Sequence, residues 1–515
     1  MGRFVKKIIT FLPVIGLSLI LQGCEMQQYY GIFTKERVKE ETEVKEDELG
    51  YSDMGNNEAP AYEVPVQTTN VKIDRIGYEP DEVKVALFEG ESIPRSFYVR
   101  NRKNGDTVYE GKIIKSADGK YFGDFSALME EGDYYIQADY IGCSYTFKVH
   151  DKLNSEIMRD AQKQYYLSRC GVTLTEQYAG ENAHNACHTA LASKREDVTV
   201  QMDVSTGWHM DEDNNRDVLT ACNTMLSLLL GYEFYSDSFD DEVNIPESDN
   251  DIADILDELR FETDWLGKMQ DINSGAVYKG ITARKTGGND VMLYVEGPDM
   301  VTTTAYAAVM AKFSYIYQSI DPAYATVCLK LADRAFRYQE TNTSPDEPEN
   351  SWRFLAAAEL YRATGYGYYK TIVDSYIYTD ILDKMQEDIL YYLGGVTYIS
   401  TKQAVDLNVC KQIMGFISKD VENICAESKK SFWGVPEKDK DDKDALMDNV
   451  IRLCVVNYVI PNYEYGTVIE NYLHYFRGRN ESAKSYMEEL KSQCVSNAKL
   501  IFLLSEIGHE ATQTF

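Results

Sequence analysis

The stretch Asn244-Ile-Pro-Glu-Ser-Asp-Asn-Asp-Ile-Ala-Asp-Ile-Leu-Asp-Glu258 carries the start of a helix. Pro246 precedes this helix. Asp249 or Asn250 can cap it, because a short side-chain oxygen accepts a hydrogen bond from a free amide of the first turn. Apolar residues then recur three and four positions apart, which predicts an amphipathic helix over 251–270. This period decides the fold class, because it continues through the chain on both sides of the quoted stretch.

The helical period fills the chain from residue 154 to residue 515. Further amphipathic segments are predicted at 155–169, 217–232, 302–319, 323–338, 352–364, 380–392, 448–459 and 467–477. Gly365 follows one of them and suits the position after a helix end, where a positive φ is common. We expect no strands between these helices, so 154–515 is predicted to be an all-α domain. Helix pairs can close into a ring, although the period alone does not require closure.

Residues 69–150 have a different pattern, in which short runs alternate between apolar and polar residues. Such runs lie at 83–88, 96–99, 107–109, 134–137 and 144–149. Asn104-Gly105 separates two of them and predicts a hairpin with a type I′ turn, which needs positive φ at both central residues. Several short strands with frequent turn signals predict an immunoglobulin-like β-sandwich.

The first 24 residues have the composition of an export signal. A basic start with Arg3, Lys6 and Lys7 is followed by the mostly apolar 8–21, which is too short and too interrupted to span a bilayer. Leu21-Gln-Gly-Cys24 resembles a bacterial lipobox, which implies cleavage after residue 23 and lipidation of Cys24. The protein is therefore predicted to be an extracytoplasmic lipoprotein of a bacterial cell membrane. An ordinary signal peptide with a chance cysteine is the alternative.

Residues 24–68 are polar and rich in glutamate, and we predict an acidic, disordered stalk there. The whole chain of 515 residues carries 52 Lys and Arg against 83 Asp and Glu, a net charge of −31, which excludes a nucleic-acid partner because phosphates would be repelled. Tyrosine is unusually frequent, at 39 residues. Its ring suits sugar binding, although core packing is its commoner role. Nine cysteines remain beside Cys24, an odd number that argues against a disulfide scaffold.

Several motifs in order resemble family 9 glycoside hydrolases, which include cellulases and endoglucanases. Val71-Lys-Ile-Asp-Arg-Ile-Gly-Tyr-Glu-Pro80 resembles the opening of the immunoglobulin-like module that one clade carries. The quoted stretch at 244–270 and the segments 303–311, 321–325, 356–365, 478–486 and 497–501 resemble packing motifs of the catalytic domain. The resemblance implies an (α/α)6 barrel over 154–515, preceded by the sandwich over 69–150. It also implies a β-1,4-glucan polysaccharide as the partner and inverting hydrolysis as the activity.

The resemblance also implies a set of site residues. Thr206-Gly-Trp-His-Met-Asp-Glu-Asp213 takes the place of the motif that holds the attacking water, so Asp213 falls on the catalytic base and Trp208 among the substrate-binding residues. Met210 replaces the second carboxylate of the family motif and cannot accept a proton. Asp211 could substitute for it if the loop shifts by one residue, which makes Asp211 a second catalytic candidate.

The general acid of the family has no clear counterpart. Only 487–496 separate Tyr486 from Asn497, and Glu488 and Glu489 in that segment have the pattern of a solvated helix face. We therefore expect hydrolysis to be weakened or lost. The alternative function is a non-catalytic glycan-binding or structural surface lipoprotein built on the same barrel.

Cysteine and histidine cluster near the start of the barrel, in the residue types that bind zinc. The resemblance implies a structural zinc held by Cys170, Cys187 and His188, with His184 or His209 left open as the fourth ligand. Buried thiol and imidazole groups without a metal are the alternative. Calcium is a weaker expectation, with oxygen ligands in the acidic segment around Glu247, Ser248 and Asp251.

Overall fold

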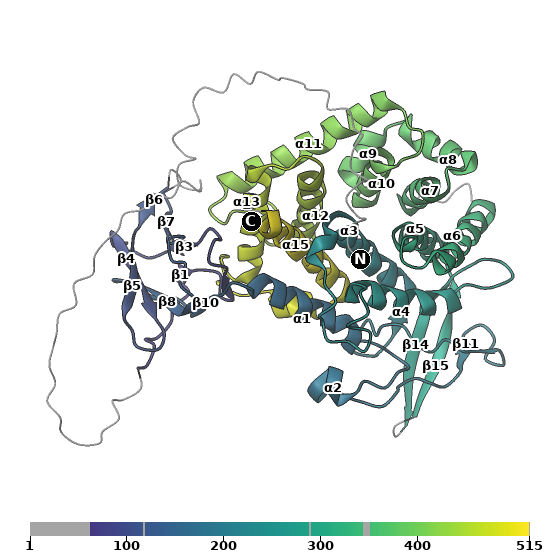
Figure 1. Cartoon of the computed structure of the whole chain (residues 1–515), viewed down its shortest axis with the longest axis horizontal. Helices are drawn as coiled ribbons and strands as arrows, with labels where there is room; N and C mark the ends of the chain where they lie inside the picture. The colour runs from purple at the N-terminus through teal and green to yellow at the C-terminus, as the bar shows by residue number, and fades with distance from the viewer. Residues whose placement is uncertain (1–61, 117–118, 288–289, 343–350, 514–515) are drawn as a thin grey trace, which may run out of the picture. The chain divides into compact units, whose positions relative to one another are not determined.

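The computed structural model describes residues 62–116, 119–287, 290–342 and 351–513 (Figure 1). The predicted signal peptide, the lipidation site at Cys24 and most of the predicted stalk lie outside these residues. Residues 62–68 already belong to the sandwich, since Gln67 forms a β-bridge with Cys143 and the Thr68 amide donates to the Cys143 carbonyl at 2.8 Å. Across the described ranges, every helix is too short or too polar to cross a membrane.

The N-terminal domain contains two β-sheets that share one hydrophobic core. One sheet has the order β1 (Val71–Lys72), β3 (Val85–Phe88), β7 (Tyr121–Asp124) and β6 (Ile114–Lys115). The other has the order β2 (Gly77–Tyr78), β10 (Phe147–Val149), β8 (Gly132–Ala138), β4 (Ser96–Asn101) and β5 (Thr107–Lys112), with β9 (Gly142–Cys143) paired to β8. Buried aromatic side chains from both sheets, among them Phe88, Phe97 and Phe147, fill the space between them.

The predicted hairpin at Asn104-Gly105 exists, because β4 and β5 pair in antiparallel fashion around it. The predicted type I′ turn is wrong, since within this turn only Gly105 has a positive φ, of 78°. The loop is longer than two residues and is closed by the Asn101 amide, which donates to the Asp106 carbonyl at 2.9 Å. A longer loop needs the left-handed conformation at a single position, which the glycine supplies.

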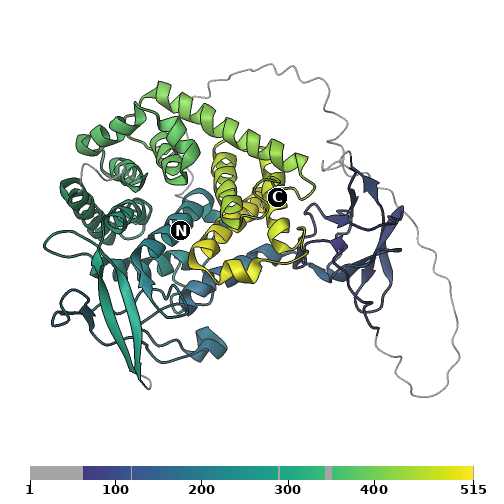
Figure 2. The ribbon, with the colours of Figure 1, turned by 180° about the vertical axis from the view of Figure 1, so that it is seen from behind.

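The rest of the described chain is mainly helical, and most of its helices lie in two layers (Figures 1 and 2). The inner helices are α3 (Val218–Tyr235), α5 (Met300–Tyr317), α7 (Ser351–Thr364), α10 (Ile389–Ser400), α12 (Lys443–Val459) and α15 (Cys494–Gln513). The outer helices are α1 (Leu153–Leu167), α4 (Asp254–Lys268), α6 (Pro322–Asn342), α8 (Gly367–Ile377), α9 (Ile381–Glu387), α11 (Leu407–Lys430) and α13 (Tyr463–Arg477). Inner helices such as α5 are buried on nearly all sides, whereas α6 and α11 bury a single stripe.

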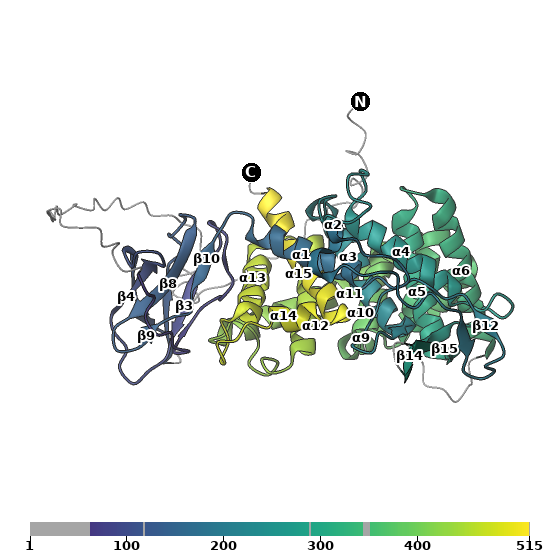
Figure 3. The ribbon, with the colours of Figure 1, turned by 90° about the horizontal axis from the view of Figure 1, so that it is seen from below.

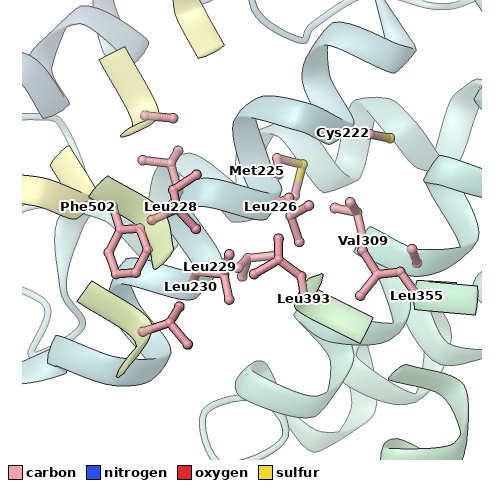
Figure 4. Packing of buried hydrophobic residues seen from close by; sticks show 14 of the residues in the cluster. Cys222, Met225, Leu226, Leu228, Leu229, Leu230, Val309, Leu355, Leu393 and Phe502 are labelled. Atoms are coloured by element: carbon pink, nitrogen blue, oxygen red, sulfur yellow. The ribbon is translucent and has the colours of Figure 1, made fainter. Parts of the chain in front are cut away.

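Contacts between helices run in a closed series. They lead from α3 through α5, α7, α10, α11, α12 and α15 back to α3, as expected for the predicted (α/α)6 barrel. Leucines of α3 converge in the middle with Val309, Leu355, Leu393 and Phe502 from four other inner helices (Figure 4). Closure of the ring therefore follows from apolar residues that face inward from successive helices.

A buried charge network shows that the inner helices run in the same direction. Arg362 of α7 pairs with Glu359 at 2.7 Å, and Lys312 of α5 lies 3.4 Å from the same carboxylate. Glu233 of α3 contacts both cations, and Thr397 of α10 donates to Glu359 at 2.9 Å. All five residues lie in the C-terminal halves of their helices, which requires these four helices to be parallel.

The other two inner helices have the same direction. Asn457, near the end of α12, donates to Glu506 of α15 at 2.7 Å, and Tyr235 at the end of α3 donates to the Cys454 carbonyl of α12 at 2.5 Å. The N-terminal ends of all six inner helices therefore share the opposite end of the ring, which we call the N-terminal face. The segments 203–217, 431–442 and 478–493 precede α3, α12 and α15 and lie at this face.

The prediction of a helical domain without strands is wrong. A five-stranded sheet inserted into it has the order β12 (Gln201–Met202), β11 (Ala192–Lys194), β15 (Asp290–Pro298), β14 (Tyr278–Gly287) and β13 (Arg216–Asp217). Along β15, Leu293 and Val295 are buried while Met292 and Tyr294 are more exposed, which is the period of a strand. The hairpin of β14 and β15 packs its inner face on α3 and α5 (Figure 3).

Two predicted helix ends differ from the structure. The segment 380–392 is divided into α9 and α10 at Asp388, whose side chain caps α10 by accepting from the Leu390 amide at 2.7 Å. Helix α4, predicted over 251–270, has Ala253 as its N-cap, and no side chain accepts a hydrogen bond there. Neither Asp249 nor Asn250 therefore caps it. Gly365 is confirmed in its role, with φ of 69° directly after α7.

The sandwich and the helical domain share a buried polar interface. Asp74, after β1, accepts from His474 of α13 at 2.9 Å, and the Arg477 guanidinium lies 3.7 Å from the same carboxylate. Arg477 also donates to Asn154 of α1, and the Asn154 amide donates to Glu79 at 2.9 Å. Burial raises the pKa of Glu79 to about 7. The interface therefore depends on groups from three distant parts of the chain.

Replacing Glu79 by Gln tests this interface through pH. Because the pKa of Glu79 is raised from 4.5 to about 7 in the folded state, wild-type stability falls as the pH rises between these values. Glu79→Gln removes that titration. Its free energy of unfolding relative to wild type should therefore rise by ~3 kcal/mol between about pH 4 and about pH 8. Urea unfolding at both pH values measures this difference.

Glu110→Gln is the matched control, because Glu110 is exposed on β5. Its difference from wild type should be the same at both pH values. A pH-independent difference for Glu79→Gln would contradict a buried, protonated Glu79.

Candidate functional site

The segment 203–217 carries most of the predicted site residues and is held at both ends. Arg216 donates from Nη1 to the carbonyls of Val204 and Thr206, both at 2.6 Å. Asp217 caps α3 by accepting from the Thr220 amide at 2.8 Å. Gly207 has φ of 83°, and a Cβ there would lie 2.6 Å from the Trp265 ring. The loop conformation therefore requires glycine at this position.

Trp208 lies in the core and cannot stack on a sugar. Its side chain is 0% exposed, with the ring centroid 4.8 Å from that of Tyr165. The indole nitrogen donates to Glu258 at 3.3 Å, and the backbone amide donates to Glu262 at 2.8 Å. The prediction of a substrate-binding Trp208 is corrected here, because a motif match identifies the residue but not the direction of its side chain.

Asp211 has a structural role in the turn. Its Oδ1 accepts from the amides of Asp213 and Asn215, both at 3.0 Å, and its Oδ2 accepts from the Asn215 side chain at 2.9 Å. Asn214 completes the turn with φ of 60°. A carboxylate occupied by three donors holds the loop and is poorly placed to orient water, so the structure does not support Asp211 as a catalytic substitute.

Asp213 has a free carboxylate in this loop, as does its neighbour Glu212. The Asp213 side chain is exposed and makes no hydrogen bond or ion pair with any residue that the structure describes. Met210 is half-buried against the core, and its thioether offers no proton acceptor of useful strength. The Asp213 carboxylate at the N-terminal face is therefore available to bind water, and among the carboxylates of this loop it alone falls on the predicted base.

Neither glutamate considered for the general acid has the environment of one. Both lie on α14 (Met487–Lys491), where Glu489 contacts Lys443 and Glu488 pairs with Lys491 at 2.8 Å. The hydrogen bond from Lys443 lowers the pKa of Glu489. A general acid at neutral pH needs the opposite shift, so these contacts favour the interpretation of α14 as a solvated helix face.

Four cysteine and histidine side chains meet beside the same loop. An isolated β-bridge between Arg169 and Trp208 brings Cys170 next to His209. The Cys170 amide donates to the Gly207 carbonyl, and the His209 amide donates to the Ser168 carbonyl, both at 2.8 Å. Cys187 and His188 complete the group from the loop after α2 (Glu176–Ala179). Three of the predicted ligands therefore come together, and His209 is the fourth member.

His184, the other histidine considered as a ligand, lies apart from the group. It is exposed, pairs with Leu174 through the backbone, and its Nδ1 lies 2.8 Å from the Asn185 carbonyl. The inclusion of His184 among the metal ligands is corrected for this reason. Its place near Cys187 in the sequence was misleading, because the chain turns between them.

The distances within the group match a tetrahedral zinc site. Bond lengths of about 2.3 Å to sulfur and about 2.05 Å to nitrogen imply separations of about 3.8 Å between sulfurs, about 3.55 Å between sulfur and nitrogen, and about 3.3 Å between nitrogens. The two sulfurs lie 3.8 Å apart, the sulfur–nitrogen pairs 3.6 and 3.7 Å, and the two nitrogens 3.3 Å. These four side chains therefore fit a zinc ion without rearrangement.

The electrostatics of the two thiols support the same fit. Contact with Cys170, followed by hydrogen bonds from His188 and His209, lowers the pKa of Cys187. The same contact and burial raise the pKa of Cys170. One thiol is thus prepared as the thiolate that a metal requires, and the other would lose its proton on metal binding.

The segment predicted to bind calcium is held by hydrogen bonds within the protein. Both Glu247 oxygens accept from Arg169, at 3.0 and 3.1 Å, and the Ser248 hydroxyl bonds to Asp254. Asp251, with φ of 66°, contributes its amide to Asp241. Among the described residues, no group of side chains that could hold a metal ion includes Glu247 or Asp251, so the structure adds no support for the calcium site.

A family profile described as glycosyl hydrolase family 9 matches residues 155–500, and one described as cellulase N-terminal ig-like domain matches residues 66–142. The chain belongs to glycoside hydrolase family 9. The predicted immunoglobulin-like module is confirmed by the second match and by the two-sheet sandwich. Both parts of the family architecture are therefore present in this chain.

Relatives of this family 9 chain are distant but cover most of it. Endoglucanase D of Acetivibrio thermocellus is 25% identical over an alignment of 471 residues that covers 82% of this chain and 73% of that protein. The xyloglucan-specific endo-beta-1,4-glucanase of Bacteroides ovatus is 26% identical over an alignment of 345 residues that covers 58% of each chain.

Solved structures of family 9 enzymes share the fold. A metagenome-derived endoglucanase superimposes with a TM-score of 0.74 at 22% identity, covering 85% of this chain and 98% of that one. A Zn-binding triple mutant of a family 9 endoglucanase superimposes with a TM-score of 0.68 at 24% identity, covering 79% and 83%. At these identities the likeness shows the fold alone.

For the family 9 site, the sequence leaves the fourth metal ligand open between His184 and His209. Only the β-bridge that brings His209 beside Cys170 decides for His209. The sequence misplaces His184, Trp208 and Asp211. The roles of Trp208 and Asp211 depend on side-chain direction, which no spacing rule supplies. Asp213 is exposed on this loop, and its role as the base stays a prediction.

Proposed function

We propose that this family 9 chain acts on β-1,4-glucan by slow inverting hydrolysis, with Asp213 as the base. The observation that supports this most is the exposed, unpaired Asp213 carboxylate, which lies at the N-terminal face in the loop that corresponds to the family's water-holding motif. The relatives are named for activity on such glucans. We further assign the closed helix series to the (α/α)6 barrel class.

In this proposal Asp213 takes a proton from a water molecule while the water oxygen attacks the anomeric carbon. The bond to the leaving oxygen breaks, and that oxygen must receive a proton. Glu489, the nearest equivalent of the family's acid in sequence, is paired with Lys443 and stays ionised. The leaving oxygen then takes its proton from solvent, which lowers the rate roughly 10²–10⁴-fold relative to a complete pair.

A non-catalytic glycan-binding or structural role is the second candidate. The observation that favours it is the pair of changes at the site, with Met210 in place of one carboxylate and an ion-paired α14 in place of the acid. The barrel and its N-terminal face would then present a surface to glycan without cleaving it.

Hydrolysis is tested by release of reducing ends from carboxymethylcellulose, lichenan and xyloglucan. Wild type should release them slowly, and Asp213→Ala should lower the rate by about 10²-fold or more, because the base is removed. Glu212→Ala is the matched control, since Glu212 is exposed in the same turn. It should keep the wild-type rate.

Equal, near-zero release by wild type and Asp213→Ala would overturn the enzymatic proposal. Affinity electrophoresis in gels that contain the same polysaccharides then tests the second candidate. Retardation of the wild type would support glycan binding, and unretarded migration would overturn it.

We also propose that Cys170, Cys187, His188 and His209 hold a structural zinc ion. Zinc would tie the end of α1, the loop after α2 and the segment 203–217 together, two residues before Asp211. The metal is assigned no part in the reaction. The support is the match between the measured separations and tetrahedral geometry.

Elemental analysis of the purified chain should find one zinc per molecule, and Cys170→Ser should lose it. Chelation should lower the thermal unfolding midpoint of the wild type, because metal binding stabilises the folded state. Cys410→Ser is the control, since Cys410 is a half-buried thiol on α11 outside the group. Zinc-free wild type, or equal zinc in both variants, would contradict the site.

We propose, finally, that Cys24 is lipidated and anchors the chain outside a bacterial cell membrane, as the lipobox-like Leu21–Cys24 indicates. The acidic segment that follows would hold the folded part away from the bilayer. In a bacterial host, wild type should sediment with membranes and Cys24→Ser should appear in the soluble fraction. Membrane association of Cys24→Ser at the wild-type level would contradict the anchor, and Cys410→Ser again serves as the control.

A further inference from the structure

A cavity of about 300 Å³ lies between the outer helices α9 and α11 and the inner helix α12. Its polar lining consists chiefly of Gln386, Asp420, Asn423, Asp439, Asn449 and Arg452. We call it the α11–α12 pocket. The volume is at the lower end of the roughly 300–1,000 Å³ range of small-molecule sites, which suits a ligand the size of a mono- or disaccharide.

The charges that line the pocket compensate each other. Arg452 donates to Asp420 at 2.8 Å, and Lys438 lies 4.0 Å from Asp439. Glu427, at the rim, pairs with Lys430 at 2.7 Å. Because each acid already has a cation, the pocket holds no uncompensated charge for an anion or a metal ion. A neutral ligand is the best match.

The lining is rich in groups that bind hydroxyls. Asn449 donates to Asp439 at 3.0 Å, which leaves the carbonyl oxygen of the amide free to accept. The amides of Gln386 and Asn423 are exposed at the rim, and the structure shows no hydrogen bond to either among the residues it describes. Carboxylates held by Arg452 and Asn449 keep further lone pairs available. Vicinal hydroxyls of a sugar need this alternation of donors and acceptors.

The wall also carries apolar atoms, among them those of Ile424 and Pro436. A pyranose ring also has both kinds of group, with hydroxyls around its edge and C–H groups on its faces. Ordered water could fill a polar cavity of this kind, and a sugar would displace it while keeping the hydrogen bonds.

The pocket opens at the end of the ring that carries Asp213. Pro436 and Asp439 belong to the segment that precedes α12, as Asp213 belongs to the segment that precedes α3. Since the inner helices are parallel, both segments lie at the N-terminal face. In the contact order of the ring, α15 separates α12 from α3. The pocket is therefore a distinct place on the same face.

We propose that the α11–α12 pocket binds a neutral sugar unit of the glucan chain, apart from the Asp213 loop. This inference rests on the proposed action on β-1,4-glucan. A polymer laid across the N-terminal face would contact both places, and the pocket would add affinity without taking part in bond cleavage.

Calorimetric titration of the full chain with cellobiose and cellotetraose tests the pocket. Asn423→Phe should weaken binding at least tenfold, because a large ring on the exposed face of α11 fills the opening. Glu422→Phe is the matched control, since Glu422 is the exposed neighbour on the same helix and does not line the cavity. It should bind within twofold of wild type. Asp420→Asn, which keeps the shape, should also weaken binding.

Thermal unfolding midpoints equal to wild type confirm that both phenylalanine variants fold. Equal binding by wild type and Asn423→Phe would overturn the pocket as a sugar site while leaving hydrolysis at Asp213 untouched. Absence of any binding by wild type would overturn it as well. The separate reducing-end assay then decides whether the proposed hydrolysis also fails.

Discussion

Four charged side chains meet inside the helical ring, and their pairing determines how the inner helices lie. Glu359 is shared by Arg362 and Lys312, and Glu233 contacts both of these cations. Such a network is stable only if every charge keeps its partners, because an isolated buried ion is costly. The pairing therefore allows little rotation or sliding of α3, α5 and α7. It also gathers their C-terminal ends and leaves their N-terminal ends free to build a site.

The parallel direction of the inner helices determines which loops form the N-terminal face. The segment before α3 is held by Arg216 from one side and by the Cys170–His209 group from the other. Within it, Asp211 uses its carboxylate to shape the turn, which leaves Asp213 exposed. The loop is thus ordered by its own polar groups, and a zinc ion would add a further tie to the same backbone.

The chain shares the domain architecture of family 9 more clearly than the family's catalytic residues. The two-domain architecture is retained over most of the chain, as the matches at 66–142 and 155–500 show. The predicted departures from the family motifs, at Met210 and at the ion-paired α14, lie at the N-terminal face. A fold of this kind tolerates such changes because its stability lies in the buried ring and not in the exposed loops.

The sequence by itself determined the helical period, the two-domain division and the family, because core packing imposes a regular spacing that motif order preserves. It also indicated Cys170, Cys187 and His188, which the structure brings together, but it did not indicate the strands β14 and β15, whose alternation is weak beside the helices. Only the tertiary structure decided that Trp208 is buried, that Asp211 shapes a turn, and that His209 and not His184 joins the metal-binding group. Those roles depend on the direction of side chains and on residues distant in the chain, such as Glu262 and Ser168. The spacing of residues along the sequence indicates neither the direction of a side chain nor its contacts with distant residues.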